Sequence, residues 1–331
     1  MSGVLVIVEQ RAGRITRIAL EAVAAAQYLA AQLDVPVSAA IAGADTESLA
    51  SEIAARAIAK VTRVEHPLLA QYTADGFIVA LQQLIQAEQP AYVVFPHTYQ
   101  VRDYAPALAA RFGQVLVSDV VAISAAAEGV AGPIFTRQLL QGRLNGNYRH
   151  TGSGPCFVSV QTGAFRADTP DHKIDKAPIT TFTPTIEPAQ IRTRPSEPFR
   201  AASQTVDLGS AQLIVSVGRG IKDAENIPIV QELATALGAE LAASRPICDN
   251  GWLPMERQVG SSGQTVSPKL YLAIGISGAI QHLVGMKGSQ CVVAINKDPD
   301  APIFEIADYG IAGDLFEVVP ALTAAVKATK Q

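Results

Sequence analysis

Apolar segments alternate with amphipathic, alanine-rich segments through the first hundred residues, and this order constrains the fold more than any other feature of the chain. The apolar runs begin with VLVIVE at 4–9 and end with AYVVFPH at 91–97. The segments between them, at about 18–33, 47–59 and 76–89, have apolar residues at helical spacing. Strands that are apolar almost throughout are typical of parallel sheets with helices on both faces. We therefore predict a doubly wound, nucleotide-binding-like α/β domain.

The pattern changes between residues 115 and 165. Three strand-like runs follow one another at 115–124, 132–140 and 156–163, and Gly-Asn-rich turns such as NGN at 145–147 separate them. Successive strands without helices between them are typical of antiparallel pairing. We predict that these runs are antiparallel strands added to the first sheet.

A proline-rich segment at 166–200 divides the chain. It contains six prolines and little periodicity, which predicts an extended connector. A second series of strands and helices follows it, and 331 residues suit two domains. We predict an N-terminal domain at 1–200, connector included, and a Rossmann-like domain at 201–331.

Charge, hydropathy and cysteine usage exclude several classes of protein. A net charge of −4 gives no basic footprint for nucleic acid. No apolar stretch approaches the roughly 18 residues that cross a bilayer, and the N-terminus reads as a strand rather than a signal peptide. Cys156, Cys248 and Cys291 lack CxxC spacing, which predicts reduced thiols and a cytoplasmic location. A mitochondrial matrix protein that has lost its transit peptide remains a second interpretation.

Loops after the predicted strands of the second domain carry unusual residues, and such loops line the ligand-binding edge of open α/β sheets. Arg219 lies between two glycines, which suits a phosphate, although the GxGxxG spacing is missing and a plain turn remains an alternative. Ser244 and Arg245 end a strand, where an arginine stacks on a flat ring or forms a surface salt bridge. The glycines and hydroxyls of 257–268 suit a heteroaromatic ligand or a flexible loop tip.

The fourth loop, after the strand at 271–277, is the most informative. Ser277 is predicted to be the N-cap of a short helix, whose N-terminus receives an anion or a carbonyl oxygen. Gln281 and His282 follow one turn later, near the ligand side. A lone histidine there is otherwise a packed or surface residue.

The C-terminal sequence resembles the signature of the electron-transfer flavoprotein alpha subunit. The matching stretches are LYLAIGISGAIQHLVGMKG from Leu270, VVAINKDPDAPIF from Val292 and ADYGIAGDLFEVVP from Ala307. The similarity extends back through VGRGIK, AASR and QVGSSG to about Ala211, and therefore covers the whole second domain. The first domain resembles the family in its α/β pattern and its opening VLVIVE strand.

This resemblance implies an FAD held mainly by the second domain, and a smaller beta subunit that completes a heterodimer. In the family the second domain swivels as a unit, and the proline-rich connector suits such a hinge. The residues that the resemblance places around FAD are Arg219, Ser244, Arg245, Val259, Gly260, Ser261, Ser262, Ser277, Gly278, Ala279, Ile280, Gln281, His282, Asn296, Asp314 and Leu315.

The resemblance also implies separate roles for these residues. Arg245 is expected beside the isoalloxazine, where its charge stabilises the anionic, singly reduced ring, and His282 is expected at the N1/C2 carbonyl edge. Ser262 is expected to donate toward N5. The adenosine end falls to Asn296, Asp314 and Leu315. Many relatives have Gln-Thr where this chain has Ser261 and Ser262, so the hydroxyl is kept, the amide is lost, and a different flavin potential follows.

The function implied is that of a redox carrier rather than a stand-alone enzyme. Its FAD takes electrons from dehydrogenases, such as the acyl-CoA dehydrogenases of fatty acid β-oxidation, and passes them singly to a quinone oxidoreductase or another acceptor. An electron-bifurcating or nitrogen-fixation-type flavoprotein that uses NADH is a second interpretation. A non-redox nucleotide-binding α/β module is a third, from a different class.

Overall fold

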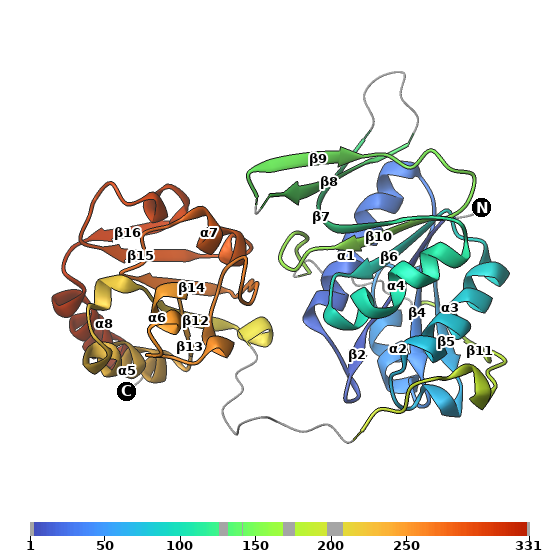
Figure 1. Ribbon diagram of the computed structural model, residues 1–331, viewed down its shortest axis with the longest axis horizontal. Coiled ribbons are helices and arrows are strands. Elements are labelled where there is room, and N and C mark those ends of the chain that lie inside the picture. The colour runs from blue at the N-terminus through green and yellow to red at the C-terminus, as the bar shows by residue number, and fades with distance from the viewer. Residues whose placement is uncertain (1–2, 126–131, 141, 168–175, 197–207, 330–331) are drawn as a thin grey trace. The chain divides into compact units, whose positions relative to one another are not determined.

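The chain folds as two compact units, one formed mainly by residues up to Pro198 and the other mainly by residues from Phe199 onward. The computed structural model describes residues 3–125, 132–140, 142–167, 176–196 and 208–329 (Figure 1). Parts of the predicted connector, at 168–175 and 197–200, lie outside the described residues.

A mostly parallel sheet forms the centre of the first unit. Its strand order is β11-β5-β4-β1-β6-β10-β7-β8-β9, and a small ribbon of β2 and β3 stands apart from it. The strands of this unit are β1 (Val4–Ile7), β2 (Gln10–Arg11), β3 (Arg14–Ile15), β4 (Val37–Gly43), β5 (Lys60–Glu65), β6 (Tyr92–Pro96), β7 (Leu116–Ser124), β8 (Ile134–Leu139), β9 (Leu144–Tyr148), β10 (Cys156–Val160) and β11 (Ile179–Phe182).

Helices cover both faces of this sheet, as its apolar strands predict. Val4 and Val6 of β1 pack in one cluster with helices α1 and α2, whereas Leu5 and Ile7 pack in the other with α3 and α4. The helices are α1 (Arg17–Leu33), α2 (Glu47–Ala54), α3 (Ala74–Glu88) and α4 (Tyr99–Arg111), with a short 3₁₀ helix η1 (Pro67–Leu69). The predicted doubly wound fold is confirmed, although α2 ends five residues earlier than expected.

Two of the strand predictions for 115–165 are wrong. β10 is not an added antiparallel strand, because it lies inside the sheet and pairs in parallel with both β6 and β7. The NGN sequence at 145–147 is not a turn but the middle of strand β9, where the Thr136 hydroxyl of β8 donates to Asn147 Oδ1 at 2.8 Å. The antiparallel addition is therefore β8 on β7, with β9 beyond it.

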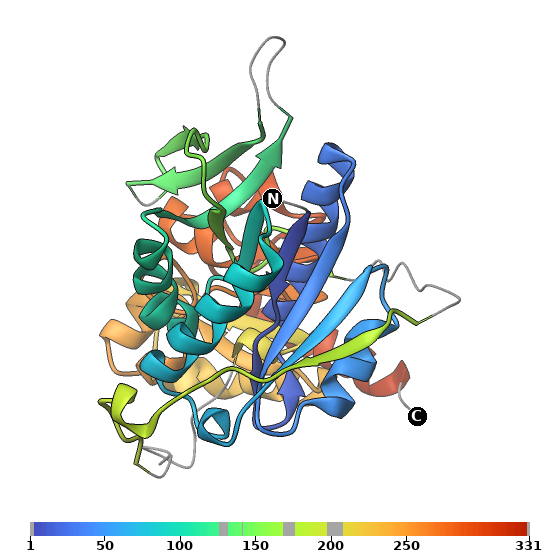
Figure 2. The ribbon, with the colours of Figure 1, turned by 90° about the vertical axis from the view of Figure 1, so that its right-hand side faces the viewer.

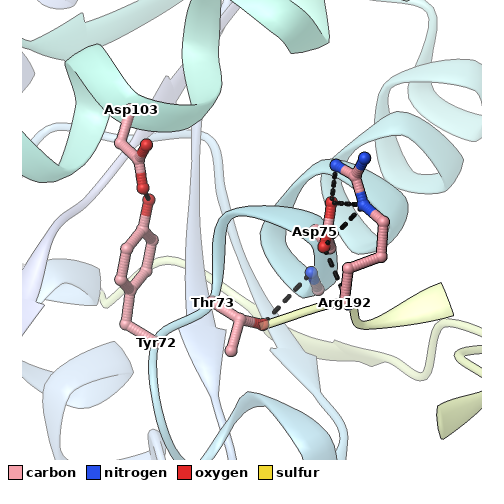
Figure 3. Close-up of polar contacts among 6 residues, drawn as sticks. Tyr72, Thr73, Asp75, Asp103 and Arg192 are labelled. Atoms are coloured by element: carbon pink, nitrogen blue, oxygen red, sulfur yellow. Dashed lines mark hydrogen bonds and ion pairs between the residues drawn. The ribbon is translucent and has the colours of Figure 1, made fainter. Parts of the chain in front are cut away.

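The connector is not extended throughout. Strand β11 within it pairs in parallel with β5, and the yellow-green segment lies along the edge of the first sheet in Figure 2. After the 3₁₀ helix η2 (Pro188–Gln190), the Arg192 guanidinium contacts the Asp75 carboxylate at the start of α3, with Nη2 2.7 Å from Oδ1 (Figure 3). We call residues 177–192 the strap, because they tie this part of the chain to the first unit.

The second unit is a five-stranded parallel sheet between two layers. Its order is β13-β12-β14-β15-β16, with α5 and α8 packed on one face and α7 on the other. The strands are β12 (Leu213–Val217), β13 (Glu240–Ala243), β14 (Leu270–Ile274), β15 (Val292–Asn296) and β16 (Tyr309–Ala312). The helices are α5 (Ile227–Leu237), α6 (Arg245–Asp249), α7 (Ile280–Met286) and α8 (Leu315–Thr329), and the 3₁₀ helices are η3 (Leu208–Ser210), η4 (Arg219–Ile221), η5 (Ala224–Asn226), η6 (Met255–Arg257) and η7 (Pro302–Ile306).

Candidate functional site

The predicted site residues gather at the carboxyl edge of the second sheet. β12, β14 and β15 are neighbouring parallel strands, and the chain passes from β12 to β13 on one side and then back across β12 to β14 on the other. A reversal of this kind opens a crevice at the strand ends, which is where open α/β sheets bind ligands. The segments that follow the five strands all start at this edge.

The loop after β12 is hydrogen-bonded through its backbone to the end of β14 and to the loop after it. Gly218 N donates to Ile274 O at 2.8 Å, and Gly220 N donates to Gly275 O at 3.0 Å. A Cβ atom at Gly218 would lie 2.4 Å from Gly275 O, so a larger residue is excluded. These glycines therefore bring two loops together, and Arg219 between them is exposed and available to a ligand.

The loop after β13 differs from the prediction. Arg245 does not end the strand but begins helix α6, because Pro246 fits the first turn of a helix, where no backbone N–H is needed. Its Nε lies 3.1 Å from Asp249 Oδ2 one turn later, in an exposed ion pair. Ser244 is buried, and its backbone N donates to Val217 O at 2.9 Å.

Residues 259–262 form a loop that lies directly against α7. Val259 N donates to Ala243 O at 2.9 Å, and Ser261 N donates to Gln281 O at 2.7 Å. Gly260 has a φ of +142°, and a Cβ atom there would lie 2.9 Å from Gln281 O. Only glycine allows this approach, which fixes the two exposed serines, Ser261 and Ser262, beside the start of α7.

The hydroxyl of Ser262 remains a possible donor. Gln258 Nε2 donates to Ser262 Oγ at 2.9 Å, so that oxygen already accepts one hydrogen bond. A hydroxyl that accepts still has its own proton to donate. This geometry is compatible with the expected donation to a ring nitrogen. Gln258 is a residue that the sequence interpretation missed.

Ser277 is not the N-cap of the helix that follows β14. Helix α7 begins at Ile280, and its N-cap is Ala279, whose side chain makes no capping hydrogen bond. The intervening Gly278 has a φ of +86°, and Ser277 O accepts a hydrogen bond from Ile303 N at 3.1 Å. The chain therefore contacts η7 before helix α7 starts. The residues exposed at the edge are Ser277, Ala279, Ile280 and Gln281.

His282 is buried on α7 and bonded to the sheet beneath it. Its Nε2 lies 2.9 Å from the Tyr271 hydroxyl of β14, and the buried Nδ1 makes no hydrogen bond of ordinary geometry with a described residue. Burial lowers the pKa of His282 to about 4, although hydrogen bonding of the ring with the Val259 backbone opposes this shift. The ring is therefore neutral at pH 7. Tyr271 is a second residue that the sequence interpretation missed.

The last two loops are held by their own side chains. Asn296 Nδ2 donates to Ile276 O at 2.9 Å, which ties the loop after β15 to the loop after β14. Asp314 Oδ1 accepts from Phe316 N at 3.0 Å and so caps α8. Helix α8 therefore starts at Leu315, which is buried.

The hydrogen bonds connect the candidate loops into one edge but do not assign every residue a role in binding. The loops of Arg219, Ser244, Val259 to Ser262, Ser277 to His282 and Asn296 contact one another through the backbone or through Asn296 itself. Arg245 and Asp314 have local partners instead, in the ion pair and the helix cap. Neither Tyr271 nor Gln258 carries a signal in the sequence, because each acts through a partner that only the fold brings near.

Comparison with known proteins covers both units. A family model described as the electron transfer flavoprotein domain matches residues 4–187, and one described as the electron transfer flavoprotein FAD-binding domain matches residues 207–287. The second match includes the candidate residues from Arg219 to His282, whereas Asn296, Asp314 and Leu315 lie beyond it.

Curated relatives match over nearly the full length. The electron transfer flavoprotein subunit alpha of Thermoanaerobacterium thermosaccharolyticum is 39% identical and is aligned over 97% of both chains. The subunit of the same name in Bacillus subtilis is 39% identical over 97% of this chain and 96% of its own. Protein FixB of Clostridium saccharobutylicum is 33% identical over 98% of this chain and 96% of its own.

Proposed function

Since this chain belongs to the electron transfer flavoprotein alpha-subunit family, we propose that it carries electrons from dehydrogenases, such as acyl-CoA dehydrogenases, to a quinone oxidoreductase or a similar acceptor. The family assigns it an FAD-binding domain and an electron-transfer role. It also implies a heterodimer with a beta subunit. The particular donors and acceptors are part of the proposal.

The residues at the carboxyl edge of the second sheet fit a flavin nucleotide. The buried Nδ1 of His282 has no hydrogen-bond partner among the described residues, and Ser261, Ser262 and Arg219 expose donors at the same edge. A flavin ring with its carbonyl and nitrogen acceptors, joined to a pyrophosphate, supplies the acceptors that such donors need. The unpartnered imidazole nitrogen is the observation that carries the proposal.

Each part of the edge has a proposed role toward the cofactor. When FAD is bound, it supplies the chemistry of taking up and releasing electrons. Arg219 offers its guanidinium to the phosphates, Ser262 a hydroxyl proton, His282 a ring nitrogen, and Arg245 a positive charge. Asn296, Asp314 and Leu315 form the proposed adenosine end, although Asn296 and Asp314 also fix their own loops. The backbone contact of Gly260 with α7 holds the ring-side donors in place.

An NADH-dependent flavoprotein, electron-bifurcating or of the nitrogen-fixation type, is the second candidate, and Protein FixB is among the curated relatives. The alpha sequence does not separate the two, because their difference lies in a second flavin held by the beta subunit. A non-redox nucleotide-binding module is less consistent with a match to an FAD-binding domain. No helix in the described part of the chain is long and apolar enough to span a membrane. The bacterial relatives support a cytoplasmic location.

Flavin counting tests the proposed function. The chain is purified together with its beta subunit, and flavin absorbance is compared with protein concentration. One flavin per heterodimer and reduction by an acyl-CoA dehydrogenase with its substrate are expected for the simple carrier. Two flavins with reduction by NADH would favour the second candidate, and a colourless heterodimer would overturn both.

A further inference from the structure

Tyr271 and His282 form a buried polar pair beneath the candidate site. Tyr271 is 0% exposed and His282 is 6% exposed. The hydroxyl and Nε2 are 2.9 Å apart, with the two rings tilted at 59°. Tyr271 comes from the sheet and His282 from α7, so the bond links the helix to the strand below it.

The direction of this hydrogen bond follows from counting donors and acceptors. If Nε2 carried the proton and donated to Tyr271, the buried phenol proton would need another acceptor and the Nδ1 lone pair would stay unpaired. If the phenol donates to Nε2, the phenol proton and the Nε2 lone pair are both used in one hydrogen bond. Only the Nδ1–H then lacks a hydrogen bond of ordinary geometry. An unsatisfied buried polar group costs roughly 1–3 kcal/mol, so the second arrangement is favoured.

We infer that Tyr271 is a positioning residue that donates to Nε2 of His282, holds the imidazole proton on Nδ1, and thereby prepares a neutral N–H donor for an acceptor atom of the bound cofactor. The inference rests on the proposed function, because FAD is the ligand that would accept from Nδ1. Its first part, the tautomer, concerns the chain alone and can be tested without FAD.

The tautomer of His282 can be measured by NMR in the full chain labelled with ¹⁵N-histidine. Long-range ¹H–¹⁵N correlation at pH 7, without FAD, shows which ring nitrogen carries the proton. His282→Gln identifies the signals. We expect the proton on Nδ1 in the parent chain. In Tyr271→Phe, we expect the ratio of the Nδ1–H to the Nε2–H form to fall by about five- to tenfold, as the loss of one hydrogen bond predicts. Tyr309→Phe is the matched control, since Tyr309 is 67% exposed in the same unit.

Each outcome has a definite meaning. A parent chain with its proton on Nε2 overturns the inference, and this measurement needs no variant that has to fold. An unchanged tautomer in folded Tyr271→Phe removes the role of Tyr271. On addition of FAD, the Nδ1–H signal is expected to shift, and a bound FAD that leaves it unchanged overturns the second part. A heterodimer with the beta subunit that binds no FAD contradicts the proposed function and leaves the result on the tautomer standing.

Discussion

The charge of Arg245 is exposed and shared with Asp249, which limits how strongly it acts on a nearby flavin. Interactions of exposed charges are worth about 0.2–1 kcal/mol, or roughly 10–40 mV for one electron. We predict that Arg245→Ala lowers the potential for the first electron by that amount, with FAD still bound. Redox titration followed by flavin absorbance measures it.

Asp249→Asn is the matched control for this prediction. It keeps the cation and removes the carboxylate that partly neutralises it, so the first-electron potential is expected to stay the same or rise. If both variants shift the potential downward equally, the effect comes from helix α6 and not from the charge of Arg245.

His282 makes the stability of the second unit depend on pH. Burial lowers its pKa to about 4, below its ordinary value of about 6.5, so the unfolded chain binds a proton that the folded chain does not. We predict that stability falls as the pH decreases from about 6.5 toward 4, by up to roughly 3 kcal/mol. Urea unfolding without FAD, followed by the fluorescence of the single tryptophan, Trp252, reports on this unit.

The His282→Gln variant isolates this contribution. Its free energy of unfolding should depend less on pH than that of the parent, and the two should converge near pH 4. His150→Gln in the first unit serves as the control and should keep the parent slope. Parallel slopes for the parent and His282→Gln would contradict the prediction.

The sequence interpretation identified residue types at the candidate site better than their contacts. Arg219, Ser262 and His282 lie at the carboxyl edge because each follows a strand, and strand order along the chain was readable. The hydrogen-bond partners of His282 and Ser262 were not readable from the sequence. Tyr271 of β14 bonds to His282 of α7, and the Gln258 side chain donates to Ser262 Oγ. Side-chain contacts of this kind depend on packing, which hydropathy patterns do not encode.

At the scale of elements, the proline-rich strap is fixed to helix α3 by an ion pair that its sequence does not indicate. Asp75 is buried at the start of α3 and accepts from both the backbone N and the guanidinium of Arg192. The ion pair holds the pKa of Asp75 below its usual value, through its hydrogen bonds with Arg192 first of all. We predict that Asp75→Asn weakens this end of the strap by about 1 kcal/mol, which corresponds to about fivefold faster trypsin cleavage after Arg192 or Arg194.

Asp103, also labelled in Figure 3, provides the control for the strap prediction. Asp103 accepts from the Tyr72 hydroxyl at 2.8 Å on α4 and makes none of the hydrogen bonds to Arg192. Asp103→Asn should therefore leave the cleavage rate unchanged. Equal rates for Asp75→Asn and the parent would show that packing of Ile186 and Ile191 holds the strap without the ion pair.

The positions of helices and strands were predictable where the spacing of apolar residues determines them. They were less predictable where pairing with a neighbouring strand determines them. β6 lies within the apolar run at 91–97 that predicted it. β10 has the same kind of run, yet nothing within it indicates that it lies between β6 and β7. β9 has mostly exposed residues around its central glycine, so its strand state comes from the pairing with β8 and not from its own composition.

At the scale of the molecule, each unit has its own core. The two clusters of the first unit contain buried residues up to Ile186, and the two of the second unit contain buried residues from Leu208 onward. The candidate site residues, from Arg219 to Leu315, all belong to the second group of elements. The core clusters of the second unit and the backbone contacts of its cofactor edge therefore lie within residues 208–329.

This separation predicts that a fragment of residues 207–331 folds and binds FAD alone. FAD at a hundred times its dissociation constant should then stabilise the fragment by about 3 kcal/mol, because a ligand that binds only the folded state adds RT ln(1 + [L]/Kd). The matching fragment of residues 1–198 should gain nothing. Thermal unfolding with and without FAD measures both. A folded 207–331 fragment that FAD does not stabilise would mean that the edge needs the first unit or the beta subunit to complete the site.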